Sequence, residues 1–448
     1  MNKDKDKAII PLVFFLLLLS ACAVDSDTTE DKGADSKVVK SGSGENQTPV
    51  QEITLEMGTS YNEEHFDIMI KEPVESEFPH ITMERVPFDT DTDVEEALSA
   101  GFVPDMIHGH QPQRIRMLSD YEMTTDLAEL ADKYSFDTSI FQPYLLDTFR
   151  TYNDGTLSAF PLNHSTNAIH YNKEIFDLFG VDYPIDGMTW DELIELARQV
   201  TGHRDGIDYH GLFVQAPDRM VLDVSFLNPD TDMPRFTEDP EFVKYLEIIE
   251  KIYSIPGNLP EELDFIFNPY DSFREDRNLA MWVSWYQATS LRTYDGLDWD
   301  LVSYPIPDKE TKLQPESKGA WMGISPYTEH EEEAFRVLEF LMTDEMFQLR
   351  AETEEQMDPA RSPLVHAAEV IELDPELYNG RNSGAYAYFP NASGPEGRSK
   401  YELEGQNLLL EMMREMVESG EDINTLLRKY QEIGAQRIGD LKSKNSDS

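Results

Sequence analysis

The stretch that decides the fold reads Phe160-Pro161-Leu162-Asn163-His164-Ser165-Thr166-Asn167-Ala168-Ile169-His170-Tyr171-Asn172-Lys173. Its second half, residues 168–171, is an extended run that predicts a strand. A helix is expected directly after it, over 173–179, because Gly180 can adopt the left-handed conformation that commonly ends a helix. The stretch therefore predicts a strand followed by a helix, the repeating unit of α/β folds.

Strand and helix patterns alternate on both sides of this stretch. Toward the N-terminus, alternating apolar residues predict strands at 53–57 and 81–86 and the start of a third at 104–108, with helical spacing at 66–70 and 94–100. Toward the C-terminus, Thr189-Trp190-Asp191-Glu192 has the pattern of a capping box and predicts an amphipathic helix to about Val200. Helical periodicity returns at 242–253, 331–342 and 406–418. This alternation predicts a parallel sheet covered by helices on both faces.

Five segments, in order along the chain, resemble motifs of one protein family. The stretch at 160–173 is one of them, and the others lie at 101–106, 176–193, 278–284 and 319–341. Together they resemble the extracellular solute-binding proteins of the sugar-binding (family 1) type, which are the capture subunits of ABC importers. The resemblance covers nearly all of residues 52–345.

The resemblance implies an α/β protein with a two-lobed periplasmic-binding-protein type II fold, in which each lobe is a mostly parallel sheet flanked by helices. Solute would bind in a cleft between the lobes, and the lobes would close on it. Crossover hinge segments are expected near 160–165, 297–301 and 326–330. The first lobe would then comprise residues 51–162 and 299–327, and the second lobe residues 163–298 and 328–448.

The N-terminal 50 residues indicate export and lipid attachment. An apolar run from Ala8 to Leu19 follows a lysine-containing start and is too short to span a bilayer, but it suits a signal peptide. It ends in Leu19-Ser20-Ala21-Cys22, which resembles the lipobox of bacterial lipoproteins, where the cysteine receives the lipid. We therefore expect a signal peptide at 1–21 and a lipidated Cys22 on the extracellular face of the cell membrane of a Gram-positive host. An ordinary secretory signal is the alternative.

The composition of the chain excludes some classes of binding partner and some kinds of cysteine chemistry. Residues 23–50 are polar and predict a flexible tether with a reach of about 30 Å. The net charge of −50 argues against nucleic acid and anionic membrane surfaces as partners, and it raises the cost of approach for an anionic solute. Cys22 is the only cysteine, which leaves no disulfide and no thiol nucleophile elsewhere.

No enzyme, cofactor or metal site is expected. Phosphate-binding loops, nucleophile elbows and HExxH motifs do not occur in the sequence. The pair His108-x-His110 has no recognisable third zinc ligand. The aspartates at 89–93 begin like a calcium loop, but the positions of its glycine and its terminal glutamate hold Val94 and Ala100.

Aromatic and polar residues are the candidate ligand contacts, because sugars present flat apolar faces edged by hydroxyl groups. The positions at which the resemblance places cleft loops, or at which a strand meets its carboxyl end, hold Tyr61, Asn62, His108, Asn163, Asn167, Trp285, Tyr286 and Trp321. Of the two asparagines at the first crossover, one is expected to contact ligand and the other to bind backbone. Trp282 and Trp299 suit the core and the cleft equally well, Trp190 suits the scaffold, and Arg361 suits a surface as well as a contact.

The leading hypothesis is a non-catalytic receptor for a neutral solute, expected to be an oligosaccharide, that works with the permease subunits of an ABC transporter. The same receptor could instead carry a peptide, a polyamine or a modified sugar. A surface polysaccharide hydrolase or lyase is the rival of another class, and release of reducing ends from glycans would support it. A third rival, an adhesin, predicts no closed cleft.

Overall fold

The computed structural model describes residues 51–88, 91–220, 224–259, 269–292, 294–317, 319–353, 361–367, 378, 380–395 and 397–446. The expected signal peptide, Cys22 and the tether lie outside these ranges. Within them, no helix has both the length and the apolar content needed to cross a bilayer.

The first sheet has the strand order β2-β1-β3-β10-β4. Its strands are β1 (Ile53–Thr59), β2 (Ile81–Pro87), β3 (Met106–Gly109), β4 (Phe160–Pro161) and β10 (Trp321–Ile324). β1 runs parallel to β2 and β3, whereas β10 runs antiparallel to β3 and β4. We call this sheet, its helices and its hydrophobic core the first lobe.

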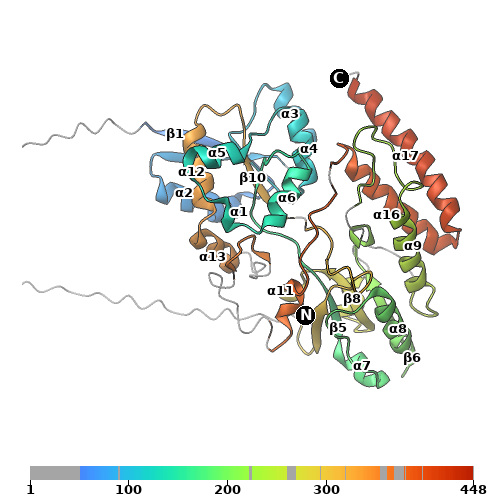
Figure 1. Ribbon diagram of the computed structural model, residues 1–448. Helices are drawn as coiled ribbons and strands as arrows, with labels where there is room; N and C mark the ends of the chain where they lie inside the picture. Colours follow the sequence, from blue (N-terminus) through green and yellow to red (C-terminus); the bar gives the residue numbers. More distant parts are fainter. Residues whose placement is uncertain are drawn as a thin grey trace, which may run out of the picture. The chain divides into compact units, whose positions relative to one another are not determined.

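Helices of the first lobe come mostly from the N-terminal part of the chain, and two come from much later (Figure 1). The N-terminal ones are α1 (Glu63–Phe66), the π-helical turn η1 (Asp67–Lys71), α2 (Glu72–Glu77), α3 (Asp91–Ser99), α4 (Gln113–Asp120), α5 (Leu127–Tyr134), η2 (Thr138–Ile140) and α6 (Pro143–Thr151). The late ones are α12 (Glu331–Leu341) and α13 (Asp344–Thr353), and their buried side chains share one hydrophobic core with β1, β3 and β10.

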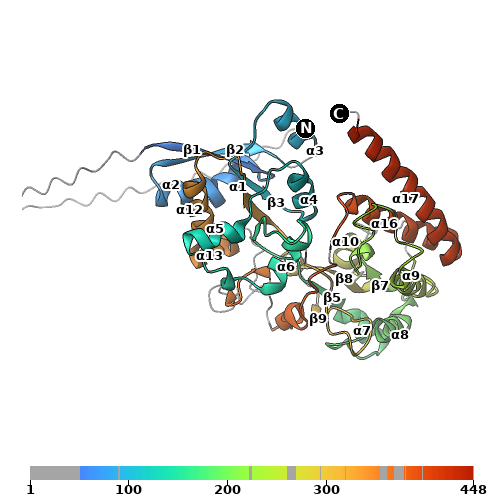
Figure 2. The same cartoon turned by 45° about the horizontal axis from the view of Figure 1, so that its top comes forward.

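The second sheet has the order β6-β7-β8-β5-β9 and a larger core. Its strands are β5 (Asn167–Asn172), β6 (Gly202–Arg204), β7 (Ile207–Val214), β8 (Leu279–Trp285) and β9 (Trp299–Ser303). Its helices are α7 (Lys173–Phe179), α8 (Trp190–Val200), η3 (Pro217–Met220), α9 (Pro240–Tyr253), α10 (Pro269–Arg274), α11 (Ala288–Leu291), η5 (Ser383–Ala387), α16 (Glu402–Ser419) and α17 (Ile423–Ser446). Figure 2 shows α16 and α17 lying beside α9, and we call this assembly the second lobe.

The sequence predicted the local elements well. Helix α7 follows β5 and ends at Gly180, which has a φ of 66°. Helix α8 begins with the expected capping box, in which the Thr189 side chain accepts from the backbone of Glu192 and the Glu192 side chain accepts from the backbone of Thr189. These side chains satisfy backbone groups that would otherwise lack partners at the helix start.

The expectation of mostly parallel sheets was wrong in detail, because both sheets are mixed. In the second sheet, β5 lies antiparallel to both β8 and β9, and only β7 and β8 are parallel. β8 lies between β7 and β5 and its residues from Leu279 to Ser284 are buried, so its sequence is continuously apolar rather than alternating. A buried run of this kind does not reveal the direction of its neighbours.

The expected crossovers also differ from the structure, except for the first. The chain passes from β4 in the first sheet to β5 in the second through residues 162–166. The second passage follows β9, not 297–301, because residues 299–303 pair in register with β5 and fill the second core. The third passage does not lie at 326–330, because α12 covers the same sheet that β10 has just completed, and Leu364 and Ala367 still belong to the first core.

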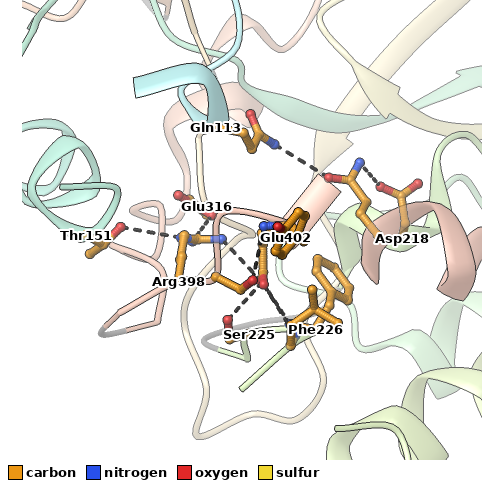
Figure 3. A network of polar contacts seen from close by, with 12 residues as sticks. Gln113, Thr151, Asp218, Ser225, Phe226, Glu316, Arg398 and Glu402 are labelled. Atoms are coloured by element: carbon orange, nitrogen blue, oxygen red, sulfur yellow. Dashed lines mark hydrogen bonds and ion pairs between the residues drawn. The ribbon is translucent and has the colours of Figure 1, made fainter. Parts of the chain in front are cut away.

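A buried ion-pair network joins segments of both lobes (Figure 3). The Arg398 guanidinium lies 2.6 Å from a Glu316 carboxylate oxygen and 3.9 Å from one of Glu402, and it lies 4.3 Å from the centroid of the Tyr152 ring. Glu402 in turn accepts hydrogen bonds from the Ser225 hydroxyl and from backbone N–H groups of the second lobe. Since Tyr152 belongs to the first core, Arg398 connects the two lobes directly.

Candidate functional site

A cavity of about 480 Å³ opens at the carboxyl end of β8. The residues that line it share an aromatic or hydrogen-bonding side chain: Ser165, Tyr270, Arg274, Trp285, Tyr286, Gln287, Thr289, Ser290 and Arg361. Most come from the second lobe, whereas Ser165 lies on the first crossover and Arg361 on the segment whose Leu364 enters the first core. Residues of the second lobe, of the first crossover and of a first-lobe segment therefore meet at this cavity.

Backbone contacts hold the cavity wall against the first crossover. The Tyr286 N–H donates to the Thr166 carbonyl at 2.9 Å, immediately after β8 ends. The Tyr286 ring packs against that of Tyr386 with 5.0 Å between centroids, and the Arg361 guanidinium lies 5.4 Å from the Tyr286 ring centroid. Tyr286 is thus fixed in place from three directions.

Arg274, at the end of α10, is held by neutral groups. Its Nη2 donates to Gln287 Oε1 at 3.0 Å and to Ser290 Oγ at 2.7 Å. The guanidinium also lies over the Tyr270 ring at 4.2 Å from its centroid, a cation–π contact within the same helix. Its Nε atom is buried without a hydrogen-bond partner among the described residues.

A buried histidine lies behind each cavity arginine. Burial, followed by the positive charge of Arg361, lowers the pKa of His164 to about 4. Burial likewise lowers the pKa of His170 to about 3, and the charge of Arg274 acts in the same direction. His170 lies between the hydroxyl groups of Tyr386 and Ser284, at 2.7 and 3.2 Å. Both histidines are therefore neutral at physiological pH.

Two of the residues expected to contact ligand, Trp285 and Tyr286, line the cavity. Trp285 is the last residue of β8 and is partly exposed, whereas the other β8 tryptophan, Trp282, is completely buried in the second core. Arg361, which suited a surface equally well, also lines the cavity. The structure thus brings these three residues together at one site.

The two asparagines of the first crossover lie outside the cavity lining. The Asn163 side chain accepts from the Ala320 N–H at 2.8 Å and so joins the first two crossovers to each other. Asn167 begins β5 opposite Trp285, and its N–H donates to Gln314 Oε1 at 3.3 Å. Asn163 therefore has the backbone-binding role that was expected of one of the pair.

Trp321 lies in the core of the first lobe rather than in the cavity. It is 2% exposed and packs against Gly109, where even a Cβ atom would come within 2.6 Å of its ring. Since β10 is an inner strand between β3 and β4, its side chains enter the core from both faces. Trp299 and Trp190 are also buried, as parts of the second core.

Two of the remaining expected residues, Tyr61 and His108, belong to an aromatic cluster at the carboxyl ends of β1 and β3. The Tyr61 ring stacks on His108 with 4.2 Å between centroids, and His110 meets Tyr61 edge-on at 5.8 Å. His108 is completely buried, its Nδ1 lies 2.7 Å from Thr59 Oγ1, and burial lowers its pKa well below the usual value. Asn62 caps α1 by accepting from His65 N. None of these side chains lines the cavity.

Six lining residues escaped the sequence analysis. Gln287, Thr289 and Ser290 directly follow Trp285 and Tyr286, so their position in the sequence could have indicated them. Tyr270 and Arg274 are four residues apart and share a helix face, but nothing in the sequence places that face beside β8. Ser165 belongs to the first crossover, where only the asparagines had been considered. Across the described residues, no group of three or more metal-binding side chains occurs.

The family model of bacterial extracellular solute-binding proteins matches residues 69–372 of this chain. Among characterised relatives, the sn-glycerol-3-phosphate-binding periplasmic protein UgpB of Brucella abortus is 35% identical over 75 residues, which are 16% of this chain and 17% of the relative. An arabinooligosaccharide-binding protein of Halalkalibacterium halodurans is 25% identical over 228 residues, 46% of this chain and 48% of the relative. The chain thus spans less than half the length of these relatives.

Solved structures show the same fold at low identity. A sugar transporter of Rhizobium etli in an open conformation has a TM-score of 0.68 at 15% identity, with 86% of this chain and 99% of that chain covered. The sugar-binding protein MalE of Xanthomonas citri has a TM-score of 0.66 at 16% identity, with 87% and 99% covered. These likenesses confirm the expected α/β fold class of periplasmic binding proteins.

Proposed function

Because this chain belongs to the bacterial extracellular solute-binding protein family, we propose that its cavity captures a carbohydrate and delivers it to an ABC importer. The match also confirms the family resemblance of the five sequence segments. Proteins of this family bind solutes without transforming them, so the chain is a binding protein and not an enzyme.

The composition of the cavity carries the carbohydrate proposal. Three aromatic rings, Tyr270, Trp285 and Tyr286, can pack against the apolar faces of sugar rings. The amide and hydroxyl groups around them can bind sugar hydroxyls, and the two guanidinium groups add stronger, charge-assisted donors. A cavity of about 480 Å³ is in the size range of sites that enclose small organic ligands.

The relatives support a polyhydroxylated solute. The names of two of them give sn-glycerol 3-phosphate and arabino-oligosaccharide as the solute; the first compound carries two hydroxyl groups and the second carries many. A polyamine is disfavoured, because Arg274 and Arg361 would repel it. A peptide remains the alternative that binding experiments must exclude.

Lobe closure would complete the site. The cavity is lined by Ser165 of the first crossover and by Arg361 of a first-lobe segment, and rotation of the lobes would change the position of Arg361 relative to the second-lobe walls. A solute that contacts both lobes would therefore favour the closed arrangement, which the permease could then recognise.

We expect membrane attachment through a lipid on Cys22, which would keep the receptor near its permease. The test is export of the wild-type chain and of Cys22→Ser in a Gram-positive host, followed by separation of membranes from medium. The wild type should remain with the membranes and Cys22→Ser should not. Equal release of both chains would contradict the anchor without affecting the solute proposal.

The decisive test of function is calorimetric titration of the purified chain with mono- and oligosaccharides, peptides and polyamines. A stoichiometric complex with a saccharide, recovered unchanged, is the expected result. The midpoint of thermal unfolding of the protein should rise with saccharide concentration, because the solute binds the native state. Binding of a peptide but of no saccharide would overturn the carbohydrate proposal.

A further inference from the structure

The charge of the cavity is opposite to that of the protein. Acidic residues outnumber basic ones by 87 to 37 in the chain. Among the described residues that line the cavity, however, the only charged side chains are two arginines, Arg274 and Arg361. From this we infer that the captured carbohydrate is acidic and bears a carboxylate or phosphate group that binds at these arginines. The inference rests on the proposed function and specifies its substrate class.

Arg274 is positioned by groups that do not neutralise it. Its hydrogen bonds go to the Gln287 amide oxygen and the Ser290 hydroxyl, and its Nε has no partner among the described residues. Tyr270, Trp282 and Tyr294 have ring centroids within 4.2, 5.7 and 5.5 Å of the guanidinium carbon. Aromatic rings and neutral acceptors fix the direction of the guanidinium but leave its full charge available to a ligand.

The surroundings of Arg274 agree with a positive potential in this part of the cavity. His170 beside Arg274 and His164 beside Arg361 are buried, and both have lowered pKa values to which the neighbouring guanidinium contributes after burial. No carboxylate is among the groups that shift either histidine. The buried titratable group near Arg274 is therefore a neutral imidazole and not a carboxylate.

Closure of the site would favour a counter-charge at Arg274. Removing a guanidinium from water without an anionic partner is unfavourable, whereas a carboxylate or phosphate matches its donors in geometry and charge. The aromatic walls, Trp285 above all, add a surface for a ring, which a simple inorganic anion would leave unused. An acidic saccharide occupies both parts of the cavity, so it suits the lining better than a neutral sugar or a free anion.

The test compares ligands of one skeleton with and without charge. Trigalacturonic acid and its methyl ester represent the carboxylate source, and glucose 6-phosphate and glucose represent the phosphate source. Each is titrated calorimetrically into wild type, Arg274→Gln and the control Arg198→Gln. Arg198 is an exposed residue on α8 of the same lobe, so its replacement makes the same change in net charge away from the cavity.

We expect at least one acidic ligand to bind at least about tenfold more tightly than its neutral counterpart. Arg274→Gln should remove that preference, and Arg198→Gln should retain it. In the wild type, added salt should weaken binding of the acidic ligand and leave the neutral one unchanged, a measurement that needs no variant.

Tight binding of a neutral saccharide, equal in wild type and Arg274→Gln, would overturn the acidic substrate while leaving the carbohydrate receptor intact. Failure of every saccharide, acidic or neutral, would overturn the proposed function and this inference together. Binding of inorganic phosphate as tightly as glucose 6-phosphate would also contradict the inference, because the aromatic walls would then contribute nothing.

Discussion

Replacement of Arg398 by methionine tests whether the buried network is held by charge. The side chains of Arg398, Glu316 and Glu402 are 3%, 11% and 5% exposed, so their charges are scarcely screened by water. Methionine keeps much of the packing over Tyr152 but leaves two buried carboxylates without their cation. Breaking a buried pair in this way typically costs about 3–5 kcal/mol, and we expect the free energy of unfolding to fall by that amount.

The pH dependence of this loss has a definite sign. Burial raises the pKa of Glu402 above its usual value, and the charge of Arg398 partly opposes that rise. Without Arg398 the pKa rises further. A carboxyl group with a raised pKa in the folded state favours folding while protonated and loses that contribution as it ionises. The loss of unfolding free energy caused by Arg398→Met should therefore be smaller at about pH 5 than at about pH 8.

The assay is urea unfolding followed by tryptophan fluorescence and circular dichroism, at both pH values. Arg437→Met is the matched control, because Arg437 also pairs with two glutamates but has a side chain 41% exposed. Its loss should cost less than about 1 kcal/mol. In a Glu316→Gln background, Arg398→Met should cost at least about 1 kcal/mol less than in the wild type. The same cost in both backgrounds and at both pH values would refute the charge argument and assign the effect to packing on Tyr152.

Three further predictions concern single residues. Trp285→Ala should weaken saccharide binding by about 1.5–3 kcal/mol in calorimetry with little change in thermal midpoint, and unchanged affinity would exclude stacking at this residue. Thr189→Ala should lower the unfolding free energy by about 1 kcal/mol through loss of the capping box, and no loss in urea unfolding would contradict that role. Gly319→Ala would place a Cβ against the Asn163 carbonyl oxygen, so it should destabilise the chain by about 1–3 kcal/mol. An unchanged midpoint of thermal unfolding would show that the backbone segments at Gly319 and Asn163 can move apart.

The sequence predicted local structure more accurately than the arrangement of strands. Periodicity and capping residues act over a few positions, so the box at Thr189 and the helix end at Gly180 could be recognised directly. Strand direction depends on distant partners. The antiparallel pairing of β5 with β8 and β9, and the return of α12 to the first lobe, have no local signal.

The sequence predicted a cavity residue only where an aromatic side chain suited to sugar binding lies at the end of a recognisable strand. Trp285 and Tyr286 follow a recognisable buried strand, and both line the cavity. Trp321 is also a tryptophan in an inner strand, but it is the first residue of β10 and packs against Gly109 in the first core, whereas Trp285 is the last residue of β8. Arg274 could not be found, because the contact of α10 with β8 is set by tertiary packing and not by any motif.

The late position of β10 in the chain has a consequence for biogenesis. The second sheet has all its strands once residue 303 has been made, whereas the first sheet still lacks β10, the strand between β3 and β4. During synthesis, the edge of β3 therefore stays unpaired until β10, more than 200 residues downstream, has been made. Domains whose sequence is interrupted cannot fold in simple N- to C-terminal order. The N-terminal lobe is therefore completed only after residues 321–324 have been made, later than the second sheet.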